Sequence, residues 1–141
     1  MTPEQITLVQ SSFDSLGSLL PKMTERFYEE LFSAKPDLRQ LFTTDLAEQQ
    51  VKFAQKLAQL VHSMPRLDEF LAHTKALGAR HVSYGVRAGD YAYVGEALIA
   101  ALAYVLGETF DRATADAWAL AYNLVAETML EGAAAARPIG I

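Results

Sequence analysis

The sequence predicts an all-α domain of six to seven helices. Apolar residues recur at helical spacing through almost the whole chain, and strand-like alternation is nowhere sustained. The chain has 141 residues, of which 51% are hydrophobic and 21% charged, which suits one ordinary folded domain. We expect the domain to occupy residues 1–132 and residues 133–141 to form a frayed C-terminal tail.

The first half of the chain carries three helix starts and one short turn. Thr2 as a capping residue, Pro3 in the first turn and Gln5 mark the first start, and Pro21 marks the second. Pro36 starts a short turn that ends at Leu41–Phe42, and Asp45 with Glu48 predicts another capping box. The apolar stripes of these three helices are Ile6, Val9, Phe13 and Leu16, then Met23, Phe27 and Leu31 beside Tyr28 and Phe32, then Phe53, Leu57, Leu60 and Met64.

The second half predicts three further helices. Pro65 separates the first of them from the preceding stripe, and the Gly85 to Gly89 stretch ends it. Gly107 ends the next one. Their stripes are Leu67, Phe70, Leu71, Thr74, Leu77 and His81, then Tyr91, Val94, Leu98, Ala101 and Val105, then Trp118, Tyr122, Val125 and Met129.

Composition excludes several classes of function. A formal net charge of -5 offers no basic surface for nucleic acid or anionic lipid. The absence of cysteine excludes disulfides, zinc-thiolate sites, iron-sulfur clusters and haem attached through a Cys-x-x-Cys-His motif. The N-terminus lacks the pattern of a signal peptide, and the longest apolar stretch, residues 97–106, is too short to span a bilayer. We therefore expect a cytoplasmic protein without a membrane partner.

The three histidines are the main candidates for metal chemistry. His62, His73 and His81 show no His-Glu-x-x-His pattern, and no Glu-x-x-His pair indicates a di-iron bundle. His81 differs from the other two because it shares a helix face with Thr74 and Leu77, so its imidazole should lie on the buried side. Taken alone, this pattern is typical of a hydrogen-bonded core histidine rather than a metal ligand.

Several segments together carry a more specific signal. They are Phe27-Tyr28-Glu29-Glu30-Leu31-Phe32, Lys35-Pro36-Asp37-Leu38-Arg39-Gln40-Leu41-Phe42, Glu48-Gln49, Ala79-Arg80-His81-Val82-Ser83-Tyr84-Gly85-Val86, Asp90-Tyr91-Ala92-Tyr93-Val94-Gly95, and Asp116-Ala117-Trp118 with Ala121-Tyr122. In this order, from about Phe27 to Tyr122, the chain resembles the bacterial single-domain globins and the globin half of flavohaemoglobins. The resemblance implies the globin fold, a 3-over-3 helical sandwich with a short or absent D helix.

The resemblance also implies a cofactor, non-covalent haem b. It makes His81 the proximal iron ligand, Phe42 the ring that packs on the porphyrin, and Phe53 with Leu57 the apolar distal wall. It assigns Tyr28 and Gln49 to the distal side as hydrogen-bond donors, and adds the haem contacts Leu77, Arg80, Lys52, Tyr91 and Val94. Helix geometry agrees independently, since Gln49, Phe53 and Leu57 share one face of their helix.

These assignments have alternatives in the sequence. Without the family segments, Tyr28 is typical of a core aromatic whose hydroxyl reaches water, and Phe42 and Phe53 are typical of plain core residues. Gln50 is adjacent to Gln49, and a slip of one residue would exchange them. Arg80 and Lys52 are expected to pair with the haem propionates, although basic residues at such places are usually only solvated.

The chain departs from the family on the proximal side. The family supports its proximal histidine with a Tyr, matched here by Tyr91, and with a Glu that falls on Ala133. Glu131 lies roughly 200° around the helix from that position, so it is a poor substitute. We expect His81 to be a fairly neutral imidazole that donates to the Leu77 carbonyl.

The resulting functional hypothesis is reversible binding of O2, or of CO or NO, at ferrous haem for oxygen scavenging or storage. One alternative is nitric oxide dioxygenation, for which a separate electron-donating reductase is expected, since no Gly-x-Gly-x-x-Gly fingerprint of a nicotinamide domain occurs. The other is a gas sensor. The oligomeric state is open between monomer and homodimer.

Overall fold

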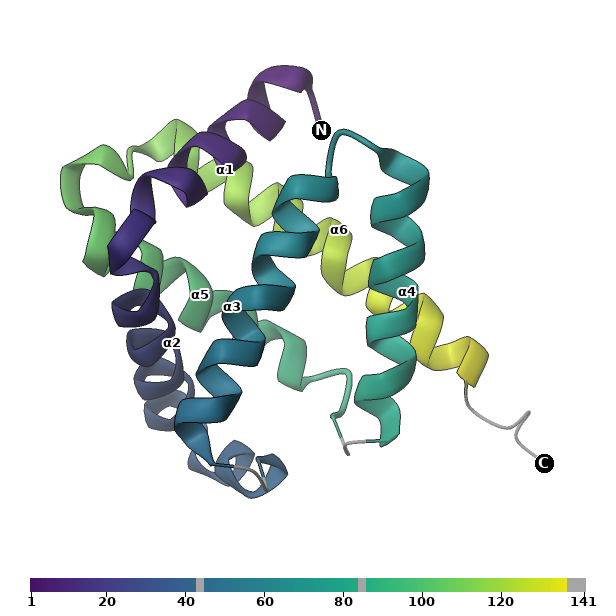
Figure 1. The fold of residues 1–141 in the computed structure, drawn as a ribbon. Coiled ribbons are helices and arrows are strands. Elements are labelled where there is room, and N and C mark those ends of the chain that lie inside the picture. Colours follow the sequence, from purple (N-terminus) through teal and green to yellow (C-terminus); the bar gives the residue numbers. More distant parts are fainter. Residues whose placement is uncertain (43–44, 84–85, 137–141) are drawn as a thin grey trace.

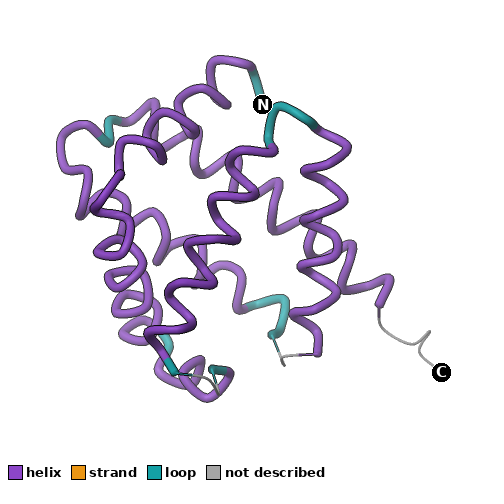
Figure 2. The backbone as a smooth tube through the Cα atoms, in the orientation of Figure 1, coloured by secondary structure: helices purple, strands orange, loops and turns teal. Residues whose placement is uncertain are grey.

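The chain folds into helices joined by short loops. A computed structural model describes residues 1–42, 45–83 and 86–136. Within these ranges it contains six α-helices, three short 3₁₀ segments and no strand, as the tube in Figure 2 shows. The prediction of an all-α fold with six to seven helices is confirmed.

The elements follow the order that the sequence predicts. They are α1 (Pro3–Leu16), η1 (Gly17–Leu19), α2 (Leu20–Ala34), η2 (Pro36–Leu41), α3 (Leu46–Ser63), α4 (Leu67–Ser83), α5 (Asp90–Leu106), η3 (Gly107–Thr109) and α6 (Arg112–Ala136). Helices α3 and α4 stand next to one another, with α6 crossing behind them (Figure 1). Helix α6 packs mainly on α4 and α1, and α2 packs mainly on α5 and α3.

Local signals explain most helix ends. Thr2 and Gln5 form a reciprocal capping box at α1, with Gln5 N donating to Thr2 Oγ1 at 3.1 Å. Gly107 ends α5 with φ 60°, a backbone conformation that favours glycine. The capping box expected at Asp45 and Glu48 is wrong: Asp45 precedes α3, but its side chain makes no capping hydrogen bond.

The C-terminal helix is longer than expected. Helix α6 continues through Ala133 to Ala136, and Ala133 is buried, so the first four residues of the expected tail belong to the folded domain. Ala has the highest intrinsic helix propensity, which favours helix through this alanine run. Residues 137–141 of the expected tail lie outside the described residues.

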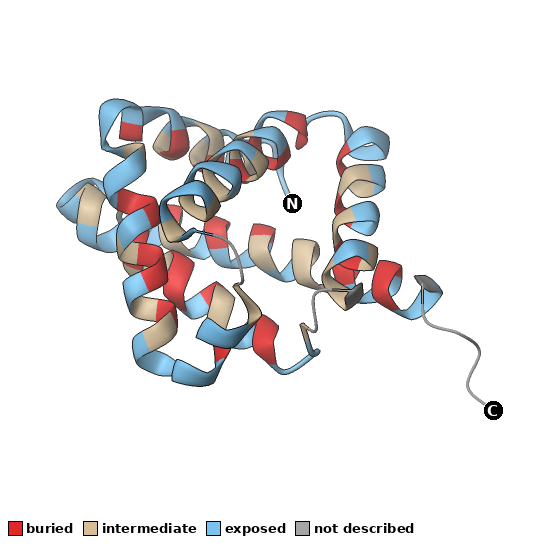
Figure 3. Ribbon diagram, turned by 60° about the horizontal axis from the view of Figure 1, so that its bottom comes forward, coloured by how far each residue is buried: buried red, intermediate tan, exposed pale blue. Residues whose placement is uncertain are grey.

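The core lies where the faces of the helices turn toward one another (Figure 3). Its largest members come from every α-helix, among them Phe13, Phe27, Leu60, Phe70, Leu102 and Trp118. Full burial of such side chains stabilises the fold by about 1.5–3 kcal/mol each relative to exposure. The buried indole nitrogen of Trp118 is satisfied because it donates to Ser12 Oγ at 2.8 Å.

Helix α5 carries the one stretch within the described residues that is long and apolar enough in composition to cross a membrane. By length and composition alone the stretch Asp90–Thr109 is apolar enough to cross a bilayer, with a mean hydropathy of 1.2, and it is longer than the apolar run noted in the sequence. Most of this stretch is α5, which packs on α2 in the core. Core helices of folded domains meet the same criterion, and 28% of the apolar window of this stretch is buried inside the structure, where Leu98, Ala101 and Leu102 join the core.

Candidate functional site

A cavity of about 460 Å³ opens between α3 and α4 and extends to α2, α5 and α6. All eleven residues expected at a haem site contribute to its lining: Tyr28, Phe42, Gln49, Lys52, Phe53, Leu57, Leu77, Arg80, His81, Tyr91 and Val94. They come from helices far apart in the sequence, so the fold itself brings them together. The lining is mostly apolar, with polar groups confined to a few positions.

His81 lies in the last turn of α4 on the cavity wall. Its Nδ1 donates to the Leu77 carbonyl at 2.7 Å, as the sequence led us to expect. A carbonyl only accepts, so this bond fixes the tautomer in which Nε2 carries the lone pair. Burial lowers the pKa of His81, and the Arg80 guanidinium lowers it further, while the bond to Leu77 opposes both. The imidazole is therefore neutral, the form that ligates a metal.

Tyr28 and Gln49 form a polar pair on another wall of the cavity. Gln49 Nε2 donates to the Tyr28 hydroxyl oxygen at 3.3 Å. Burial raises the pKa of Tyr28 to about 12, although the bond from Gln49 acts in the opposite direction. The Tyr28 hydroxyl therefore keeps its proton at neutral pH and can donate it. Gln49 lines the cavity and Gln50 does not, which favours the first of the two alternatives in the sequence.

Aromatic rings surround Tyr28. Phe42 meets its ring edge-on at 5.4 Å, and Phe53 does so at 5.8 Å. Phe53 is itself stacked on Phe27, with ring centroids 4.3 Å apart and planes 12° apart. These contacts restrict the rings to one arrangement and keep the surroundings of the Tyr28 hydroxyl apolar, which strengthens any hydrogen bond it makes.

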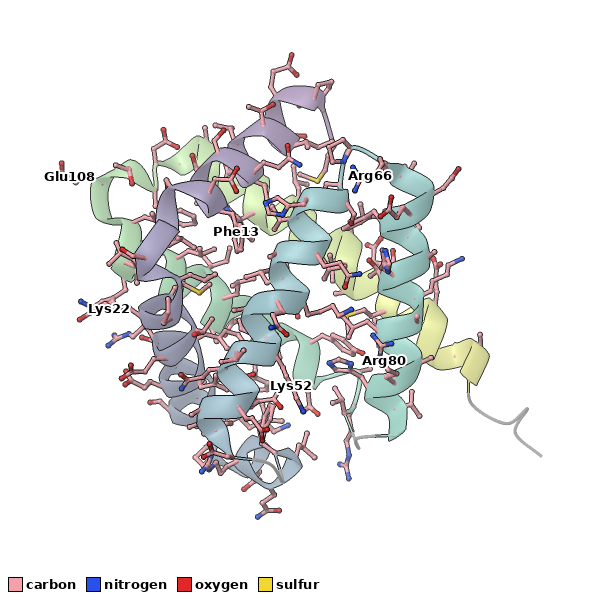
Figure 4. All side chains as sticks on the ribbon, viewed as in Figure 1. Phe13, Lys22, Lys52, Arg66, Arg80 and Glu108 are labelled. Carbon is pink, nitrogen blue, oxygen red and sulfur yellow. The ribbon has the colours of Figure 1, made fainter. Side chains whose placement is uncertain are left out.

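Three cations gather on the lining of the cavity. Lys52 and Lys56 lie one turn apart on α3, and Arg80 lies on α4; Figure 4 labels Lys52 and Arg80. Burial lowers the pKa of the Lys56 ammonium, and the charge of Arg80 lowers it further. Like charges held this close favour an anionic ligand between them. Lys56 was missed in the sequence, although its place one turn after Lys52 is a usable signal.

The position that the resemblance assigns to a supporting glutamate is Ala133. Ala133 is buried one turn beyond Met129, which lines the cavity, whereas Glu131 is exposed and lies 3.9 Å from Lys75. Glu131 therefore does not take over the role. Tyr91 is buried and lines the cavity, and its backbone carbonyl accepts a hydrogen bond from the Tyr122 hydroxyl.

An ion pair holds the start of α5 beside this cavity. Lys35 Nζ lies 2.8 Å from Asp90 Oδ1, and the Arg87 amide donates to Asp90 Oδ2 at 2.9 Å. Burial acts to raise the pKa of Asp90, but the bonds from Lys35 and Arg87 outweigh it, and the net shift is downward. The Asp90 side chain is 5% exposed and lines the cavity. The sequence placed Asp90 in one of the segments that carry the family resemblance but did not assign it to the site.

The residues present fit a haem. An apolar cavity with one neutral imidazole suits a flat, largely apolar metal macrocycle, and the cations suit its propionates. The Globin family matches residues 25–129, which include the whole constellation. The chain belongs to the globin family. Membership implies haem binding and the globin fold.

Curated relatives of this globin come from bacteria. Flavohemoprotein of Bordetella pertussis is 33% identical over 133 residues, covering 92% of this chain and 33% of that protein. Flavohemoprotein of Deinococcus radiodurans is 32% identical over 137 residues, with the same shares. This globin thus spans one third of the length of those relatives.

Solved structures agree on the fold. A bacterial globin from Campylobacter jejuni superposes with a TM-score of 0.83 at 24% identity and covers 95% of this chain and 97% of that one. A hexacoordinated heme protein from an anhydrobiotic tardigrade gives a TM-score of 0.86 at 18% identity, with 95% and 96% covered.

Proposed function

We propose that this globin binds oxygen, or another diatomic gas, reversibly at a haem b held by His81. The observation that carries the proposal is the shared cavity, which brings a neutral, half-buried imidazole together with a Tyr28–Gln49 donor pair. Haem, when bound, supplies the iron at which the gas is held. The chain has no cysteine, which excludes thioether attachment and favours non-covalent binding of the haem.

The chain's own residues would divide the work as follows. His81 presents Nε2 to the metal while Leu77 holds the ring. Phe42, Phe53 and Leu57 exclude water, and Tyr28 donates to the gas where negative charge develops. Gln49 supports Tyr28 through its hydrogen bond. The Tyr28 hydroxyl and the Gln49 amide are two donors on the same wall of the cavity, which favours slow release of the gas. Slow release suits oxygen scavenging or storage better than transport.

A second candidate is nitric oxide dioxygenation with a separate reductase, and the flavohemoprotein relatives are the observation that favours it. The buried Ala133 weighs against it, because a carboxylate at this position would raise the basicity of the proximal imidazole and an alanine side chain does not. Stopped-flow turnover of nitric oxide with a supplied reductase separates the two. Sustained turnover would favour the enzyme, and a single reaction per oxygen bound would favour storage.

The two glutamines provide a matched test of the distal side. We expect Gln49→Leu to speed oxygen dissociation, because the variant removes the hydrogen bond that supports Tyr28. A neutral hydrogen bond is worth about 0.5–1.5 kcal/mol, which corresponds to roughly twofold to tenfold in rate. Gln50→Leu is the control and should leave the rate unchanged. Stopped-flow measurement that found the effect in Gln50→Leu instead would show that the register is shifted by one residue.

The cations at the cavity lining should retain the haem through its propionates. We expect Lys56→Gln, and likewise Lys52→Gln and Arg80→Gln, to speed haem transfer to an acceptor globin. A partly exposed ion pair contributes about 0.2–1 kcal/mol, or up to about fivefold in rate. Lys22→Gln is the control, since exposed Lys22 lies outside the cavity lining. Haem dimethyl ester, which lacks the propionate charges, should be lost equally fast from all variants; a persistent difference would mean that these side chains act by packing instead.

A glutamate can be introduced at position 133, where the resemblance places the family's acid. We expect Ala133→Glu to raise the iron–histidine stretching frequency of the ferrous protein and the rate of its reaction with peroxide. Ala134→Glu places the same charge on an exposed position and serves as the control. Because Ala133 is buried, the folded fraction must be verified by circular dichroism first. A strongly anionic histidine signature already present in wild type, or no change in a folded, haem-loaded variant, would contradict this assignment.

A further inference from the structure

Helices α4 and α6 approach one another through two glycines. A Cβ on Gly78 of α4 would run into the backbone carbonyl of Met129 on α6, and a Cβ on Gly132 of α6 would run into the backbone carbonyl of Lys75 on α4. Both would lie far inside van der Waals contact. The arrangement is reciprocal, because each glycine packs on the residue three positions before the other. Neither helix can carry a side chain there at the present spacing.

This crossing determines where α4 lies. Helix α4 packs far more extensively on α6 than on α3, next to which it stands in Figure 1. Gly78 is buried in the interface, three residues before His81. A change in the spacing of α4 and α6 would therefore move the segment that carries the imidazole.

The imidazole is tied to its own helix. The bond from His81 Nδ1 to the Leu77 carbonyl, at 2.7 Å, makes the ring follow the backbone of α4. The position of the ring therefore follows the packing of α4.

We propose that Gly78 and Gly132 are positioning residues that set the distance and tilt of the His81 imidazole at the haem. This inference rests on the proposed function, because it assumes that His81 ligates the iron. The two glycines touch neither haem nor gas. They act through the spacing of α4 and α6, and so tune the iron–histidine bond and the affinity of the site.

The test compares three glycine-to-alanine variants loaded with haem. Gly132→Ala and Gly78→Ala each add a methyl group at the crossing, whereas Gly89→Ala adds one in open space at φ −65°, a conformation that alanine accepts. We expect the ferrous iron–histidine stretching band to shift by several wavenumbers in the first two, with a severalfold change in the rate of carbon monoxide binding. Gly89→Ala should match wild type. Unchanged bands in the crossing variants would overturn the proposal.

A second arm separates positioning from general disruption of the pocket. In a His81→Gly background, free imidazole can ligate the iron without a tether to α4. There Gly132→Ala should no longer shift the iron–imidazole band, and a shift as large as in the tethered protein would overturn the proposal. If neither crossing variant folds by circular dichroism while Gly89→Ala does, the glycines serve the fold and not the tuning, which also overturns it. Failure of the proposed function itself would be recognised separately, as a wild type without a histidine-ligated haem spectrum.

Discussion

His81→Ala protein is expected to lose its native haem ligation entirely. The reason is geometric, because His73 lies two helical turns before His81, roughly 12 Å along the helix axis. The His73 ring contacts Glu69 and Gln59 on the outer face of the helix. His62 is exposed on α3 and lies 3.2 Å from Asp14. Neither can reach the cavity without moving a helix. The measurement is the absorption spectrum of the ferrous and carbon-monoxide forms.

The control for that variant is His73→Ala. It removes an exposed histidine from the same helix, and its spectra should be those of wild type. Added imidazole should restore ligation in His81→Ala, because the truncated side chain leaves space at the iron. Wild-type spectra from His81→Ala in the absence of imidazole would show that another residue holds the haem.

Tyr28→Phe is expected to have the second largest effect, on the release of oxygen. Bound oxygen becomes partly negative and carbon monoxide much less so, which means that a hydroxyl donor stabilises the first selectively. A charge-assisted hydrogen bond is worth about 1.5–3 kcal/mol, or roughly tenfold to a hundredfold in the dissociation rate. Carbon monoxide dissociation should change far less. Stopped-flow displacement measures both rates.

The pKa of Tyr28 adds a pH dependence to this prediction. Since burial raises the pKa to about 12, the hydroxyl donor persists across the neutral and moderately alkaline range. Oxygen release from wild type should therefore stay slow up to about pH 10, where an ordinary tyrosine would be half ionised. Tyr104→Phe is the matched control, because Tyr104 is 56% exposed and lies away from the cavity. Equal oxygen release in wild type and Tyr28→Phe would exclude a distal role for Tyr28.

Helical periodicity made the fold predictable, because nearly every stripe identified in the sequence became the buried face of a helix. The capping box at Thr2 formed, whereas the same pattern at Asp45 did not, since a pattern of residue types does not determine whether a side chain turns toward the backbone. The apolar stripe of the last helix ends at Met129, but α6 continues to Ala136. The high helix propensity of the alanine run favours this extension, which the stripe alone does not predict.

The residues of the candidate site could be predicted from the sequence, whereas the spacing of the helices that carry them could not. The family resemblance brought forward Tyr28, Gln49 and His81, and the fold places all three on one cavity. The contact between Gln49 and Tyr28 favours one of the two registers that the sequence left open. The crossing at Gly78 and Gly132 could not be foreseen, since it depends on the angle and distance at which two helices meet, and neither is encoded in the periodicity of either helix.

The central claim is that this globin holds a haem through His81 and leaves room for a gas beside Tyr28. Absorption spectra of the purified wild-type protein in its ferric, ferrous, oxygenated and carbon-monoxide forms test it most directly. We predict one haem b per chain by pyridine haemochrome, histidine ligation in the ferrous form, and distinct reversible spectra with oxygen and with carbon monoxide. A protein that takes up no haem, or whose ferrous spectrum is unaffected by either gas, would contradict the account.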